Sequence, residues 1–184
     1  MEPAKTERLW FAHTVEAMFV RAFGVRLTPA LRARVASRGI DLDRLKPAYP
    51  VDEVVAALKN IVPDVFGRVP EAEAMHQLGV SFMQGYVETL VGKAMVQMMK
   101  LIGARRTLER MQKNFRTGGN YVETRFKALG PTQVELWIND VSDIPDWYRG
   151  VIEEGGRMVG AKNLRVTQRH DAGQAWFLDV TWDG

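Results

Sequence analysis

The chain has 184 residues, of which 46% are hydrophobic, 26% are charged and none is cysteine. A chain of this length buries roughly 70% of the surface that its unfolded form exposes, so we expect one globular domain spanning residues 1–184. The absence of cysteine excludes disulfides, iron–sulfur clusters and thiol catalysis. No segment is apolar enough to span a membrane, and the charged first ten residues do not resemble a secretory signal. We therefore expect a cytoplasmic protein.

The helical part of the chain is predicted to cover residues 1–117, after a short strand at 9–11. Apolar residues recur every three or four positions in several segments, and Thr-Pro, Pro and Gly mark the ends of these segments. The predicted helices are residues 12–23, 29–38, 51–62, 70–102 and 104–117. The longest of these, 70–102, would run for about eight turns.

A stripe of small residues runs beside the large apolar residues of segment 70–102. Its members lie four, four and three positions apart: Ser81, Gly85, Thr89 and Gly92. Glycine inside a helix costs about 1 kcal/mol relative to alanine, so the stripe predicts that another backbone packs closely there, within the fold or across a homodimer. The alternative is a kink near Gly79 or Gly85.

The last third of the chain, residues 118–184, is predicted to form the sheet. Apolar and polar residues alternate in 122–127 and 134–139, and again in 164–168 and 176–182, with a turn at 171–173. A helix at 145–159 separates the two hairpins. The order strand, strand, helix, strand, strand predicts an α+β fold in which the helical two-thirds pack on an antiparallel sheet.

Residues able to catalyse a reaction are few. The chain has three histidines, at positions 13, 76 and 170, and none stands in the pattern of a catalytic triad or of a zinc motif. His76 lies near Glu71, Glu73 and Gln77 early in a predicted helix, so we expect it to be solvated. We infer that the protein is not an enzyme and holds no metal.

Positive charge is concentrated between residues 100 and 127. Arg106, Arg110 and Lys113 are predicted to share one helix face, opposite an apolar face. This interaction surface could contact phosphates, anionic lipid or an acidic protein, or it could be only a solvated face. No motif for sequence-specific nucleic-acid recognition accompanies it.

Methionines cluster between residues 75 and 111, which suits either an irregular core or an adaptable apolar pocket. Four aromatic residues could line such a pocket and bring polar atoms to it: Phe82, Tyr86, Trp137 and Tyr148.

Three motifs carry a resemblance to known proteins. They are Gly85-Tyr86-x-x-Thr89, the run Phe115-Arg116-Thr117-Gly118-Gly119-Asn120-Tyr121, and Pro145-x-x-Tyr148-x-Gly150. With these motifs the chain resembles an uncharacterised paralogous family of myxobacteria, whose familiar form has Asn at position 119. It is more distantly similar to 4-vinyl reductase domains, TRAPP subunits and haem nitric-oxide/oxygen sensors. The resemblance implies a module that binds apolar small molecules or partner proteins.

Two functions remain open at this point. The first is a non-enzymatic sensory or regulatory module that binds a small apolar ligand, such as a fatty acid, without a cofactor. The second is a protein–protein interaction subunit with a solid core. We expect no haem, because His76 is not placed to be its axial ligand.

Overall fold

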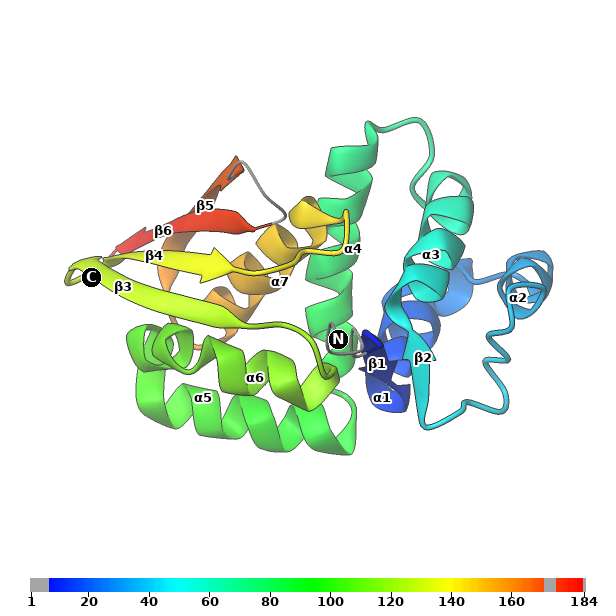
Figure 1. Ribbon diagram of the computed structural model, residues 1–184, viewed down its shortest axis with the longest axis horizontal. Helices are drawn as coiled ribbons and strands as arrows, with labels where there is room; N and C mark the ends of the chain where they lie inside the picture. The colour runs from blue at the N-terminus through cyan, green and yellow to red at the C-terminus, as the bar shows by residue number, and fades with distance from the viewer. Residues whose placement is uncertain (1–6, 171–174, 184) are drawn as a thin grey trace, which may run out of the picture.

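The computed structural model describes residues 7–170 and 175–183 (Figure 1). The turn predicted at 171–173 lies outside these residues. The helices are α1 (Ala12–Glu16), the π-helical turn η1 (Ala17–Arg21), the 3₁₀ turn η2 (Gly24–Arg26), α2 (Pro29–Ala36), α3 (Val51–Phe66), α4 (Glu71–Tyr86), α5 (Leu90–Glu109), α6 (Met111–Gly118) and α7 (Pro145–Met158). The strands are β1 (Leu9–Phe11), β2 (Ala48–Pro50), β3 (Thr124–Gly130), β4 (Gln133–Ile138), β5 (Lys162–His170) and β6 (Trp176–Asp183).

The main sheet is antiparallel, with the strand order β3-β4-β6-β5. Val134 pairs with Val180, which pairs with Val166, so these three buried side chains lie on the inner face of the sheet. The predicted α+β fold is confirmed. Of the short antiparallel pair β1-β2, the sequence predicted β1 alone, because no pattern marked residues 48–50 as a strand.

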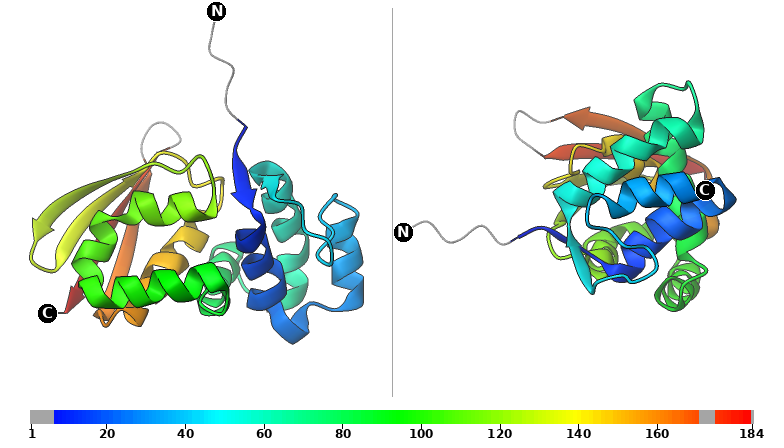
Figure 2. Two further views of the ribbon diagram at one scale, coloured as in Figure 1. Left: turned by 90° about the horizontal axis from the view of Figure 1, so that it is seen from below. Right: turned by 90° about the vertical axis from the view of Figure 1, so that its right-hand side faces the viewer.

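Helix α4 lies between the N-terminal helices and the half of the molecule that contains the sheet (Figures 1 and 2). On one side it crosses α7 at two glycines, where a Cβ on Gly79 would lie 2.2 Å from the carbonyl oxygen of Trp147. A Cβ on Gly150 would lie 2.3 Å from the carbonyl oxygen of His76. Only glycine allows the two backbones to approach so closely.

The predicted helix over residues 70–102 is wrong in one respect, because the chain breaks it into α4 and α5. Thr89 is the N-cap of α5: its hydroxyl accepts a hydrogen bond from the Gly92 amide at 3.0 Å and donates one to the Tyr86 carbonyl at 2.8 Å. The predicted break at Gly103 is present, because this residue has a non-helical φ of 77° inside α5. The helix predicted at 104–117 is divided once more, at Arg110. Apolar residues keep helical spacing across both unpredicted breaks, so their periodicity could not show them.

The small-residue stripe is therefore not one continuous ridge. Gly85 does pack closely, since a Cβ there would lie 2.6 Å from Cβ of Arg21 in η1. Gly92 is crowded instead by the carbonyl oxygen of Tyr86, and Thr89 serves as a cap. Ser81 is half-buried. Across the described residues, none of the helices has the length and apolarity that crossing a membrane requires.

Candidate ligand cavity

A largely apolar cavity of about 70 Å³, partly open to solvent, lies where α4, α5, α6 and α7 meet. Its wall also includes side chains from β1 and α1. The lining residues are Trp10, Thr14, Phe82, Met83, Tyr86, Met95, Met99, Ala104, Thr107, Leu108, Met111, Asn114, Phe115, Thr117, Gly118, Trp147, Val151, Ile152, Gly155, Gly156 and Val159.

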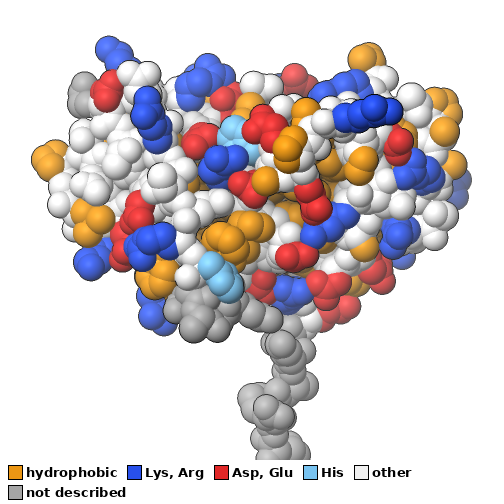
Figure 3. Space-filling view, turned by 90° about the horizontal axis from the view of Figure 1, so that it is seen from above, with side chains coloured by type: hydrophobic (Ala, Val, Ile, Leu, Met, Phe, Trp, Pro, Cys, Tyr) orange, Lys and Arg blue, Asp and Glu red, His pale blue; other side chains and the backbone are white. Residues whose placement is uncertain are grey.

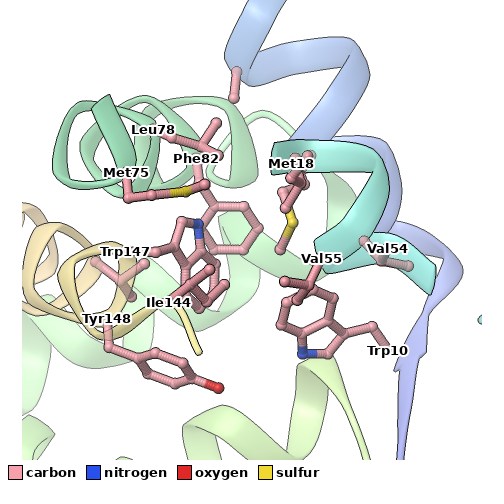
Figure 4. Close-up of a cluster of buried hydrophobic side chains, with 14 of the residues drawn as sticks. Trp10, Met18, Val54, Val55, Met75, Leu78, Phe82, Ile144, Trp147 and Tyr148 are labelled. Carbon is pink, nitrogen blue, oxygen red and sulfur yellow. The ribbon is translucent and has the colours of Figure 1, made fainter. Parts of the chain in front are cut away.

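Aromatic rings form the wall of the cavity next to α4 and α7. Phe82 stacks on Tyr86 with ring centroids 5.4 Å apart, and it lies 5.0 Å from the indole of Trp147. Trp10 is 5.8 Å from Trp147 on its other side (Figure 4). The indole N–H of Trp147 has no hydrogen-bond partner among the described residues.

Methionines form much of the rest of the lining. Met83, Met95, Met99 and Met111 line the cavity, whereas Met75 is packed in the core and Met98 is exposed. Methionine is unbranched and flexible, so these side chains can move to fit molecules of different shape. The methionine cluster in the sequence was therefore the best available signal for the cavity.

The three threonine hydroxyls of the wall are already engaged as donors. Thr14 donates to the Gly118 carbonyl at 2.9 Å, Thr107 to that of Met99 at 3.4 Å, and Thr117 to that of Asn114 at 2.7 Å. None of the described residues in the lining is charged. An ion would enter this wall without a partner, so the cavity suits a neutral molecule.

Tyr86 places its hydroxyl at the edge of this wall. Burial raises the pKa of Tyr86, and its hydroxyl lies 3.4 Å from the hydroxyl of Thr117, at the long end of hydrogen-bond distance. The phenol is neutral at physiological pH and retains hydrogen-bonding capacity. A ligand hydroxyl or carbonyl would therefore find its best partner here.

A second pair of tyrosines stabilises α7 behind the cavity. The hydroxyl of Tyr148 lies 2.9 Å from that of Tyr121, which accepts a hydrogen bond from Ser142 at 2.8 Å. Burial raises the pKa of Tyr121 to about 12 and raises that of Tyr148 well above its usual value. Both hydroxyls serve to hold α7 against the sheet.

The four predicted ligand-binding residues do not meet in one place. Phe82 and Tyr86 line the cavity, and Tyr148 lies one layer behind it, with its ring 4.9 Å from that of Trp147. Trp137 does not reach the cavity, because it lies on the outer face of β4, where the Arg125 guanidinium is 4.3 Å from its ring.

The sequence did not predict several of the lining residues as part of a ligand site. Met111 and Phe115 stood on a predicted apolar face, and Trp147 stood beside Tyr148 in the late motif, so each had a local signal. Trp10 had none, because only the pairing of β1 with β2 and the bridge from Trp10 to Gly119 bring it to the wall.

Two of the three histidines lie away from the cavity. The third, His13, lies beside its wall: its ring is 5.9 Å from that of Tyr86, and its buried Nε2 has no hydrogen-bond partner among the described residues. His76 is not solvated as expected: its Nε2 lies 2.6 Å from a carboxylate oxygen of Glu153 on α7, and the side chain is half-buried. His170 packs on Trp176 at the sheet, 4.9 Å between rings. Over residues 7–170 and 175–183, no cluster of three or more potential ligands could hold a metal ion.

The predicted basic surface is exposed. Arg106, Arg110 and Lys113 all face solvent, although the break at Arg110 means that they belong to two helices. None of the three forms an ion pair with another described residue, in contrast to Arg116, which lies 3.6 Å from Glu123.

A second, open cleft of about 680 Å³ lies between α3 and the loop that precedes α7. Figure 3 shows acidic, basic and apolar side chains mixed over the upper face of the molecule. In the cleft, Arg8 pairs with both Asp52 and Asp140, and Lys59 lies 3.4 Å from Glu71 while it also pairs with Asp143. Both of its cations are therefore paired with carboxylates, which makes it a weaker candidate than the cavity.

Comparison with known proteins identifies the family. The sequence profile of a family described as "Protein of unknown function (DUF2378)" matches residues 8–183. The chain belongs to this family. Among curated proteins no significant match exists.

Solved structures show that this DUF2378 protein is similar in fold to H-NOX proteins. An H-NOX protein from S. oneidensis in the Fe(II) ligation state has 8% identity and a TM-score of 0.72, with 94% of this chain and 96% of that chain covered. An oxygen-binding H-NOX domain related to soluble guanylate cyclases, in its oxygen complex, has 13% identity and a TM-score of 0.68, with 94% and 95% covered. An H-NOX from T. Tengcongensis has 13% identity and a TM-score of 0.63, with 94% and 97% covered.

Proposed function

We propose that this DUF2378 protein is a non-enzymatic sensory module whose cavity binds a small, neutral, apolar ligand. The observation that carries the proposal is the apolar space of about 70 Å³ beside Phe82, Tyr86 and Trp147, lined by aromatic rings and methionines. The similarity in fold to oxygen-binding H-NOX domains supports a role in sensing a small molecule.

Haem is the cofactor that the fold suggests, since one of the similar structures concerns haem redox potential and porphyrin distortion. The residues present do not fit it. No histidine or cysteine stands among the described lining residues, and the space is far below the roughly 300–1,000 Å³ of sites for larger ligands. We therefore expect that adding haem to the purified protein produces no Soret band from a bound complex. A Soret band lost in a lining variant, such as Tyr86→Phe, would contradict this.

The size and polarity of the cavity define the ligand class. An engineered apolar cavity of about 150 Å³ holds benzene, so a space half as large holds only a few heavy atoms. A longer ligand would fit after the flexible methionine side chains move and enlarge the cavity. A fatty acid, expected from the sequence, would bring a carboxylate to a wall without a cation. A neutral alcohol of similar length suits the wall better.

Titration with hexanol and with hexanoate, followed by tryptophan fluorescence, tests this function. Trp10 and Trp147 report binding directly because both line the cavity. We expect hexanol to bind and hexanoate to bind at least tenfold more weakly. Ala104→Leu should fill the cavity and abolish the response. Ala94→Leu is the matched control on the exposed side of α5 and should leave it unchanged.

The alternative function, a protein–protein interaction subunit, predicts the opposite result. A solid core would give no saturable fluorescence change with either probe, and Ala104→Leu would behave as Ala94→Leu does. That outcome would reject the ligand-binding module in favour of the interaction subunit.

A further inference from the structure

The outer side of α5 carries apolar side chains that nothing in the described chain covers. Leu90 and Leu101 are each 88% exposed, and Val91 and Met98 are 41% and 38% exposed. Leu90 and Leu101 are eleven residues apart, which places them within about 20° of one another around the helix and about 16 Å apart along it. The buried residues Val96 and Met99 lie on the opposite side.

Positive charge flanks this α5 face, which we define as Leu90, Val91, Met98 and Leu101. Lys93 and Lys100 belong to the same stretch of helix as the face, whereas Arg105 and Arg106 follow the non-helical Gly103, and Arg105 lies 3.4 Å from Glu109. Neither Lys93 nor Lys100 forms an ion pair with another described residue. In Figure 2, left, α5 runs across the underside of the molecule, where it is open to a planar partner.

We propose that the α5 face docks the protein on an anionic lipid surface. Protruding leucines flanked by lysines are the pattern of a helix that lies in the membrane interface, with its apolar side chains among the acyl chains and its cations at the headgroups. A bilayer accepts protruding side chains without a complementary groove. Anionic headgroups supply the negative charge that residues 90–102 lack.

A second copy of the chain is a poorer occupant. A symmetric dimer would bring the lysines of one α5 close to those of the other, and like charges repel.

Sedimentation with lipid vesicles tests the proposal on the full chain. We expect binding to phosphatidylcholine vesicles that contain phosphatidylserine, weaker binding in high salt, and little binding to phosphatidylcholine alone. The double variant Leu90→Gln/Leu101→Gln should weaken binding about tenfold, because binding strength scales with the apolar area inserted. Lys93→Gln/Lys100→Gln should weaken it several-fold and reduce its dependence on salt.

Val25→Gln is the matched control, because Val25 is fully exposed but lies in η2, far along the chain from α5. It should bind as the unaltered chain does. Since all these side chains are exposed, circular dichroism should show the same fold and melting temperature for every variant. No binding to anionic vesicles, or equal binding by the Leu90/Leu101 variant, would overturn the proposal. A loss of self-association in that variant without any vesicle binding would assign the face to a dimer instead.

Discussion

At the crossing of α4 and α7, two backbones touch because neither Gly79 nor Gly150 has a side chain. A Cβ at either position would meet a backbone carbonyl oxygen at 2.2 or 2.3 Å, and backbone atoms cannot rotate away as a side-chain end can. The crossing also sets the distance between Phe82 and Trp147, which lie one turn or less from it. The geometry of the cavity wall therefore depends on these glycines.

Gly150→Ala should lower the free energy of unfolding by roughly 1–3 kcal/mol or more, because it overpacks the crossing. Gly155→Ala in the same helix is the control. Its Cβ would lie 3.5 Å from the Met83 methyl group, an ordinary contact, so the gain in helix propensity should stabilise the protein by up to about 1 kcal/mol. Urea unfolding measures both. Equal effects of the two substitutions would mean that the crossing tolerates a methyl group.

Tyr121 makes stability depend on pH at the alkaline end. Its pKa is about 12 in the folded protein against 10 ordinarily, so the unfolded chain loses this proton first as the pH rises. The stabilisation is complete below pH 10 and should fall between pH 10 and 12. Tyr121→Phe should give a shallower decline over this range in thermal melts. The decline should not vanish, since burial also raises the pKa of Tyr148. An unchanged slope would contradict the buried position of the Tyr121 hydroxyl.

Among the elements, the break between α4 and α5 shapes the cavity most. If the helix had continued straight from Tyr86, α5 would leave the molecule and the methionine wall would be lost. Instead, the Thr89 hydroxyl donates to the Tyr86 carbonyl at the end of α4 and accepts from the Gly92 amide at the start of α5. The chain changes direction here, and α5 brings Met95 and Met99 to the cavity. Only five of the twenty residues of α5 are buried, so the helix is held mainly at this cap and at the cavity.

Removing the cap should loosen α5 in particular. Thr89→Ala should cost about 1 kcal/mol and speed hydrogen exchange at the Gly92 amide, which loses its acceptor. Thr28→Ala removes the equivalent cap of α2, where the hydroxyl accepts from the Leu31 amide at 3.3 Å. We expect Thr28→Ala to lower stability by a similar amount and to speed hydrogen exchange at the Leu31 amide. Hexanol binding should weaken in Thr89→Ala alone. If both variants bind hexanol equally, the cap does not position the cavity wall.

At the scale of the whole molecule, the sequence predicted the elements better than their meeting points. The alternation of apolar and polar residues in β4 identified the strand and placed Trp137 on the same face as Glu135. The structure confirms this as the outer face, where Trp137 pairs with Phe177 on β6. That alternation was sufficient to remove Trp137 from the pocket. The glycine crossing could not be predicted, because nothing local distinguishes Gly79 and Gly150 from glycines that mark a kink.

The cavity itself depends on contacts between distant parts of the chain. Trp10, Phe82, Met111 and Trp147 are separated by up to 137 positions, and each looks locally like an ordinary core residue. Composition indicated an apolar pocket through its methionines, but whether they enclose space or fill it depends on packing. Packing to within the volume of one methyl group is a property of the folded molecule.

The central claim is that α4, α5, α6 and α7 form a ligand cavity, and crystals pressurised with xenon test it most directly. Xenon enters dry apolar cavities and scatters strongly, so its position can be seen without knowledge of the natural ligand. We predict a xenon peak within contact distance of Phe82, Met111 and Trp147, and its loss in Ala104→Leu crystals but not in Ala94→Leu crystals. A well-ordered protein with no xenon at this position, or with xenon only in the open cleft beside α3, would contradict the account.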